Sequence, residues 1–202
     1  MEAGELKGWI TRLKETVLET FSDRLCFIGL QGSHARGEAG PDSDIDVVVI
    51  LDHLTYLDLK KYEGLLDTLP ARELVCGFLS GKEELAHWHR GDLFQFYHDT
   101  IPIYGDLNWL GSMLKRQDAV NAVKVGICNI YHMCVHNSIH EKEKEILKNL
   151  YKSARFVLQA KYYLESGEYI KTKAELLQRL TGRDKEMMQA VAEDLWNSDF
   201  DQ

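Results

Sequence analysis

The first half of the chain alternates segments of helical and strand-like hydrophobic spacing. Apolar residues recur at three- and four-residue intervals from Trp9 to Leu18, which predicts a helix. A continuous apolar run at Leu25–Leu30 predicts a buried strand, and Asp44–Leu51 predicts another that is buried on both faces at its far end. Later patterns predict a helix at Leu57–Leu69 and strands at Leu74–Leu79, Leu93–Tyr97 and Ile101–Tyr104. This order of elements indicates a mixed α/β layer.

The second half of the chain has a different pattern. After Gly105 the strand-like runs stop, no proline follows Pro102, and long helical periodicity begins. The pattern predicts four helices, at about Leu110–His136, Glu141–Ser166, Tyr169–Leu180 and Asp184–Trp196. We therefore expect two domains, an α/β domain over residues 1–106 and a helical bundle over residues 107–202.

Composition limits the classes of protein that the chain can be. No apolar run approaches the roughly 18 residues of a membrane span, and the acidic N-terminus does not resemble a secretory signal. We expect a cytoplasmic protein without membrane contact. The net charge of −8 argues against a long nucleic acid as partner, because most of the affinity for such a polymer comes from basic residues. The four cysteines form no Cys-x-x-Cys, so we expect four buried thiols.

Asp44 and Asp46 are the first candidates for chemistry. Side chains two residues apart in a strand point to the same face, so the two carboxylates project together. Because like charges repel, such a pair usually persists where a cation lies between them. Oxygen ligands select a hard ion, and Mg²⁺ typically combines one or two carboxylates with substrate phosphates. The pair therefore predicts both a metal and a phosphate-bearing substrate.

The turn before this strand is the second candidate. Gly32 permits close approach to the backbone, and exposed N–H groups together with the Ser33 hydroxyl can bind phosphate oxygens. Arg36 lies about one helical turn further on. A Gly-Ser turn or an Asp-x-Asp strand edge by itself is common in proteins without such a function. Either motif therefore indicates this function only in combination with the other.

The two motifs occur together. Gly-Ser-x-x-Arg-Gly, a short loop and Ser-Asp-Ile-Asp-Val-Val-Val follow one another, and Gly29–Leu51 resembles the signature of the DNA polymerase beta superfamily of nucleotidyltransferases, particularly its small bacterial members. The resemblance implies an α/β (α+β) nucleotidyltransferase fold with a mixed sheet, followed by an all-α helical bundle. It also implies that Asp44 and Asp46 bind two Mg²⁺ ions. Gly32 and Ser33 would hold the triphosphate, with Arg36 and Ser43 as supports.

The resemblance requires a third carboxylate on a neighbouring strand as metal ligand and general base. Glu73 precedes the strand predicted at Leu74–Leu79 and is similar in position to the glutamate of the streptomycin/spectinomycin adenylyltransferases. The alternative is that Glu73 is an ordinary exposed residue, in which case Asp92 and Asp99 are the substitutes.

A weaker resemblance lies in the helical half. The segment from Arg155 to Leu177 is similar to the C-terminal helices of aminoglycoside adenylyltransferases, which implies that Arg155 and Lys173 face the nucleotide. Alternatively, Lys173 simply lies at an exposed helix start.

Together these features predict an enzyme that transfers AMP from ATP to a hydroxyl of a small, aminoglycoside-like acceptor and releases pyrophosphate. The alternatives are a protein adenylyltransferase of the antitoxin type and a regulatory nucleotide-binding module without turnover. The oligomeric state does not follow from the sequence.

Overall fold

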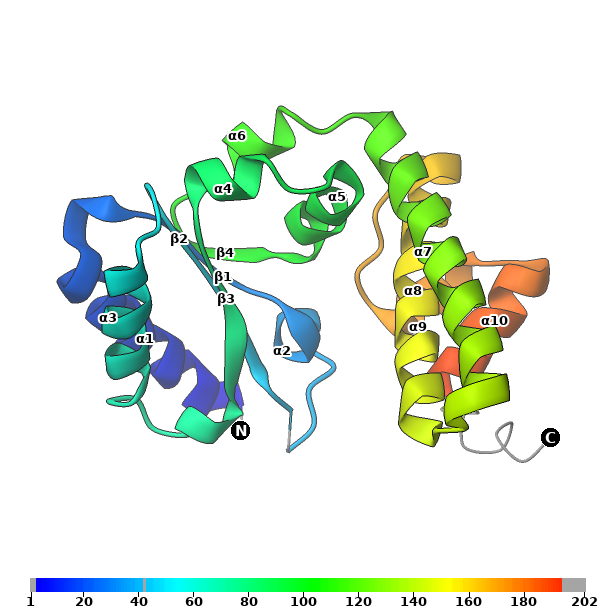
Figure 1. The fold of residues 1–202 in the computed structure, drawn as a ribbon, viewed down its shortest axis with the longest axis horizontal. Helices are drawn as coiled ribbons and strands as arrows, with labels where there is room; N and C mark the ends of the chain where they lie inside the picture. The colour runs from blue at the N-terminus through cyan, green and yellow to red at the C-terminus, as the bar shows by residue number, and fades with distance from the viewer. Residues whose placement is uncertain (1–2, 42, 194–202) are drawn as a thin grey trace. The chain divides into compact units, whose positions relative to one another are not determined.

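The computed structural model describes residues 3–41 and 43–193 of the 202 (Figure 1). The chain separates into two compact units, one of residues 1–88 and 99–113 and one of residues 89–98 and 114–202. No helix among the described residues is long and apolar enough to cross a membrane.

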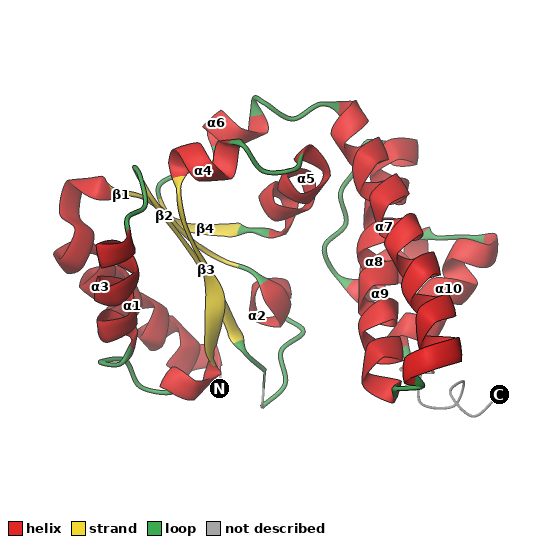
Figure 2. Ribbon diagram, in the orientation of Figure 1, coloured by secondary structure: helices red, strands yellow, loops and turns green. Residues whose placement is uncertain are grey.

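The first unit is built on a mixed sheet with the strand order β3-β2-β1-β4 (Figure 2). The central strand β2 runs antiparallel to β1 and parallel to β3, and β4 lies antiparallel on the other side of β1. The strands are β1 (Leu25–Leu30), β2 (Ile45–Leu51), β3 (Val75–Gly81) and β4 (Ile101–Tyr104). The helices are α1 (Ala3–Phe21), α2 (Gly32–Arg36), α3 (Tyr56–Leu66), α4 (Lys82–Ala86) and α6 (Asn108–Gly111), with the 3-10 turns η1 (Ser22–Arg24) and η2 (Arg72–Leu74).

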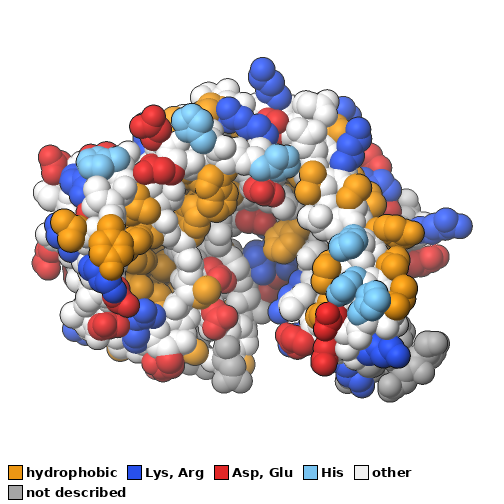
Figure 3. All heavy atoms as spheres, viewed as in Figure 1, with side chains coloured by type: hydrophobic (Ala, Val, Ile, Leu, Met, Phe, Trp, Pro, Cys, Tyr) orange, Lys and Arg blue, Asp and Glu red, His pale blue; other side chains and the backbone are white. Residues whose placement is uncertain are grey.

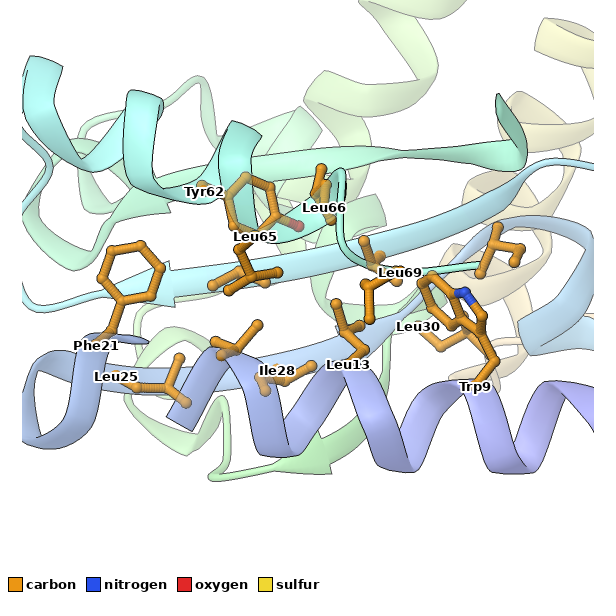
Figure 4. Packing of buried hydrophobic residues seen from close by; sticks show 14 of the residues in the cluster. Trp9, Leu13, Phe21, Leu25, Ile28, Leu30, Tyr62, Leu65, Leu66 and Leu69 are labelled. Carbon is orange, nitrogen blue, oxygen red and sulfur yellow. The ribbon is translucent and has the colours of Figure 1, made fainter. Parts of the chain in front are cut away.

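One face of the sheet carries the main core of this unit. Trp9, Leu13 and Val17 from α1 pack with residues of α3 against β1 and β2 (Figure 4). Alternate residues of β2, from Ile45 to Leu51, enter this cluster, so Asp46 and the other intervening residues point to the opposite face. The core therefore fixes which face of β2 presents the aspartate.

The second unit is helical. Its two long helices, α7 and α8, lie side by side, and α10 packs with both α8 and α9. Gly126 permits close packing of α7 on α8, since a Cβ at this position would lie 2.4 Å from Cγ2 of Val157. The elements are α5 (Arg90–Asp99), α7 (Arg116–His136), the π-helical turn η3 (Asn137–Glu141), α8 (Lys144–Ser166), α9 (Lys173–Arg179) and α10 (Gly182–Ala192).

The predicted fold class is confirmed, a mixed sheet with helices followed by a helical region. The strand predicted at Leu93–Tyr97 is wrong, because this apolar run lies in α5. A short run buried on several sides has no periodicity that separates strand from helix. The helix predicted at Leu110–His136 is two helices, α6 and α7, and Trp196 lies outside the described residues. The boundary between residues 106 and 107 stays a prediction.

The prediction of four buried thiols is also wrong. All four cysteines are free thiols, but Cys76 on β3 and Cys128 on α7 are exposed, and Cys26 and Cys134 are half-buried.

On the face of the molecule shown in Figure 3, basic side chains are interspersed with acidic ones.

Candidate active site

The turn between β1 and α2 is joined to β2 by its backbone. The N–H of Gln31 donates to the carbonyl oxygen of Asp46 at 2.8 Å, directly where β1 ends. Gly32 follows with φ +67°, a conformation that favours glycine, and begins the short helix α2. Gly37 ends this helix in the left-handed region. The predicted glycine-serine turn is thus held beside the predicted metal strand.

The Asp46 side chain lies directly against the Gly32 backbone. A Cβ added to Gly32 would lie 1.7 Å from Oδ2 of Asp46, so any other residue here would displace this carboxylate. The backbone conformation favours glycine at position 32, and glycine also leaves the Asp46 carboxylate in its place. The structure brings together the two motifs that the sequence suggested.

The electrostatics of the pair match a cation site. Burial raises the pKa of Asp46 and the nearby charge of Asp44 raises it further, while Arg36 and His34 act in the opposite direction. Asp44 is exposed and Asp46 half-buried. A positive ion that contacts both carboxylates would relieve their repulsion. Carboxylate oxygens at an accessible strand end fit Mg²⁺.

His34 is a site residue that the sequence analysis missed. It lies on α2, and its charge is one of those that act on Asp46. Its Nε2 is buried without a hydrogen-bond partner among the described residues. In the sequence, His34 lies within Gly-Ser-His-Ala-Arg, at a position that the motif does not specify. Only the fold shows that it lies near Asp46.

The two supporting residues, Arg36 and Ser43, have partners within the loop. Nε of Arg36 lies 3.0 Å from Oε2 of Glu38, so part of its charge is already neutralised. Ser43 closes the loop that leads to β2, because its hydroxyl accepts from the Gly40 N–H at 2.9 Å. In this arrangement both residues shape the loop that positions Ser33 and Asp44.

The turn is also anchored on its other side, to β4. Nε2 of Gln31 donates to the Thr100 hydroxyl at 2.7 Å, and Thr100 is buried. Gly29 allows this close approach, since a Cβ there would lie 2.5 Å from Cγ2 of Thr100. The residues before Gly32 are therefore fixed from both neighbouring strands.

Glu73 lies outside the strand on which a third carboxylate is expected. It belongs to the 3-10 turn η2 that precedes β3, and it is exposed. The residue of β3 that pairs with Asp46 is Cys76. The assignment of Glu73 as ligand and base stays a prediction. Of its substitutes, Asp92 is exposed in the second unit and Asp99 is buried just before β4.

Arg155 and Lys173 lie in the second unit, where the structure joins their segments. Arg155 is buried on α8, and its Nη2 donates to the carbonyl oxygen of Lys171 at 3.2 Å. Gln159 donates to the same carbonyl at 3.1 Å and to that of Ile170 at 2.8 Å. Lys173 then begins α9. Arg155 thus supports the segment that leads to Lys173, and contact of either residue with a nucleotide stays a prediction.

Comparison with known families gives a match in the first half of the chain. Residues 10–84 match the model of the nucleotidyltransferase domain family. This segment is therefore similar to nucleotidyltransferase domains, in agreement with the resemblance of its motif. It includes the glycine-serine turn, Asp44, Asp46 and β3. A comparison with curated protein sequences gives no match.

A solved structure shares the fold. The crystal structure of spectinomycin adenyltransferase AAD(9) from Enterococcus faecialis with ATP and spectinomycin is 13% identical, with a TM-score of 0.54 over 93% of this chain and 89% of that one. At this identity the likeness shows the fold alone. A toxin-antitoxin structure with AMP-PNP is 19% identical over 65% of this chain and 95% of that one, but its TM-score of 0.36 supports no argument.

Proposed function

We propose that this protein transfers AMP from ATP to a hydroxyl group of a small molecule and releases pyrophosphate. The observation that carries the proposal is the contact between Gly32 and Asp46 within a nucleotidyltransferase domain. It joins a turn suited to phosphates with a carboxylate pair suited to Mg²⁺, which are the two requirements for binding a nucleoside triphosphate.

Each site residue has a defined task in this reaction. Asp44 and Asp46 would hold Mg²⁺, as two ions, and the bound metal neutralises phosphate charge and makes a hydroxyl more acidic. Gly32 leaves its backbone open to a phosphate oxygen, and the Ser33 hydroxyl donates to another. The acceptor oxygen forms a bond to the α-phosphorus while the bond to pyrophosphate breaks. The hydroxyl proton passes to a base, for which Glu73 is the sequence-based candidate.

Three observations support a small acceptor. The net charge of −8 disfavours a long nucleic acid. The chain also shares its fold, over most of its length, with an adenyltransferase crystallised with ATP and spectinomycin. Phe78, two residues after Cys76 on β3, meets Trp88 edge to face with ring centroids 4.7 Å apart. Trp88 is 42% exposed, so it offers an aromatic surface to a sugar or base ring. An aminoglycoside-like acceptor fits this description.

Lys173 belongs to the same proposal as a cation for the nucleotide, with Arg155 holding its segment in place. Thr172 caps the helix that Lys173 begins, accepting from the Glu175 N–H at 3.3 Å, so the lysine lies at a defined position. An acidic protein that binds a triphosphate requires such local positive charge.

The test is transfer of label from ATP labelled at the α-phosphate. The full chain is incubated with Mg²⁺ and either a panel of aminoglycosides and related polyols or a cell lysate. Labelled small molecules are expected, and Asp46→Asn abolishes the label. Asp23→Asn, at an exposed aspartate in η1, is the matched control and keeps it.

The other outcomes decide against the proposal. Labelled protein bands in the lysate would show a protein adenylyltransferase instead. Binding of Mg²⁺-ATP without pyrophosphate release, with every acceptor offered, would show a regulatory nucleotide-binding module.

A further inference from the structure

The residue beside Asp46 on the neighbouring strand is a cysteine. The strands β2 and β3 run parallel, and Asp46 pairs with Cys76. Paired residues of neighbouring strands point to the same face of the sheet. Cys76 therefore stands next to Asp46 on the face away from the α1 and α3 core, and it is exposed.

The register that places Cys76 there is fixed. The pairing is continuous along both strands, from Ile45 with Val75 to Leu51 with Gly81. The next residue, Gly77, has φ +141°, and a Cβ on it would lie 2.0 Å from the carbonyl oxygen of Val47. Since a one-residue slip would place Cys76 or Phe78 at this contact, the register cannot shift to bring another side chain beside Asp46.

Glu73 does not take this place. It lies three positions before Cys76 in the 3-10 turn, where the chain is not yet paired with β2. The charged groups that act on the pKa of Asp46 are Asp44, Arg36 and His34. Among the described residues, no three side chains of His, Cys, Asp or Glu are grouped so that they hold a metal ion.

We propose that the protein provides only Asp44 and Asp46 to the divalent cation, and that Cys76 occupies the place where a carboxylate would complete the site. Thiol sulfur is a poor ligand for Mg²⁺, which prefers oxygen. The remaining ligands must then come from the phosphates of the nucleotide and from water. Cation binding consequently depends on the nucleotide, and the cation alone binds weakly. This inference rests on the proposed function for the identity of the site.

A gain of affinity tests the inference. Mn²⁺ alone is titrated into the full chain without nucleotide, by calorimetry or by loss of its free electron paramagnetic resonance signal. Cys76→Asp supplies a third carboxylate and raises the affinity for Mn²⁺ about tenfold or more, since ligand charge sets affinity at such sites. Cys76→Asn has the same shape without the charge and leaves the affinity unchanged, as does Glu73→Gln.

Two results would overturn the inference. Equal Mn²⁺ affinities in the Cys76→Asp and Cys76→Asn variants, both folded by circular dichroism, would show that position 76 does not face the cation. A loss of affinity in Glu73→Gln would show that Glu73 reaches the site and that three carboxylates are already present.

A second measurement uses the thiol itself. In a variant with Cys26, Cys128 and Cys134 replaced by serine, the rate at which iodoacetamide modifies Cys76 is measured with and without Mg²⁺-ATP. The nucleotide should slow the modification several-fold because its phosphates lie beside the thiol; an unchanged rate contradicts the inference.

Failure of the proposed function is recognised separately. If Asp46→Asn leaves the affinity for Mn²⁺-ATP unchanged, the nucleotide site itself lies elsewhere. If Asp46→Asn lowers that affinity and Cys76→Asp changes nothing, only the inference about Cys76 fails.

Discussion

The two ends of β2 each present a pair of aspartates, and the pairs differ in what surrounds them. Beyond the far end, Asp52 and Asp58 both bind the guanidinium of Arg24, with Nε 3.1 Å from Asp52 and Nη1 2.8 Å from Asp58. At the near end, Asp44 and Asp46 lie close to each other beside Gly32.

The pKa shifts of the two pairs have opposite signs. The hydrogen bonds from Arg24 hold the pKa of Asp58 well below its ordinary value, while burial and the charge of Asp44 raise that of Asp46. One pair has its cation built into the protein and stabilises the fold; for the other we propose a cation from outside. The second pair is therefore the one available for chemistry.

The largest expected effect comes from removing a carboxylate at the near end. Asp46→Asn should lower the rate of nucleotidyl transfer about a thousandfold, equivalent to roughly 4 kcal/mol of transition-state stabilisation. The free energy of unfolding should not fall, since the change removes a repulsion rather than a bond. Initial rates and urea unfolding measure the two effects. A large loss of stability would mean that Asp46 supports the fold as Asp58 does.

Replacing Asp58 at the far end should lower stability and leave nucleotide binding unchanged, the reverse of the result expected for Asp46. Asp58 is 1% exposed and also caps α3, where its carboxylate accepts from the N–H and the hydroxyl of Thr55. Asp58→Asn should lower the free energy of unfolding by about 3 kcal/mol, because it leaves Arg24 without its main partner. The affinity for Mg²⁺-ATP should stay unchanged. Asp52→Asn, at the more exposed partner, should cost less.

Arg155 and Lys173 extend the comparison to the second unit. Arg155→Met should lower the free energy of unfolding by about 2 kcal/mol, since the Lys171 carbonyl loses a charged donor. Lys173→Gln should weaken ATP binding about tenfold, by loss of a charge-assisted contact. Thermal unfolding and ATP titration separate the two effects. If Lys173→Gln leaves the affinity for ATP unchanged, this lysine does not contact the nucleotide.

The smallest effect is the pH dependence of stability from Asp58. Its folded-state pKa lies below the ordinary 3.8, so its contribution is present above about pH 4 and is lost as pH falls further. The difference in unfolding free energy between wild type and Asp58→Asn should therefore shrink as the pH falls below about 4. Urea unfolding at several pH values measures it, and a constant difference would contradict the role given to Arg24.

The parts of the site that the sequence predicted lie close together along the chain. Gly32 and Asp46 lie on consecutive elements joined by one loop, so their motif could be recognised without knowledge of the fold. Cys76 could not be found in this way, because a helix and a turn separate β3 from β2 and the register of a parallel pair is not visible in the sequence. For the same reason the sequence could not show that Glu73 lies in the 3-10 turn before β3.

The fold was predicted best where the pattern had one physical interpretation. The strand at Leu25–Leu30 has the predicted limits, because apolar residues end there at a polar, glycine-containing turn. The run Leu93–Tyr97 failed because Leu93, Phe94 and Phe96 are all buried in a helix, which gives an apolar run without a polar face. Exposure of Cys76 and Cys128 was missed because cysteine is usually a buried residue.

The edges of the sheet bear on how this protein behaves at high concentration. An edge strand offers unpaired backbone groups on which a strand of another molecule can build, and this is a common start of aggregation. On β4 the edge contains Pro102, which has no N–H to donate, and on β3 Gly77 has a φ of +141°. Both edges therefore resist extension of the sheet, and the strand that presents Cys76 can stay open to ligands without drawing other chains to it.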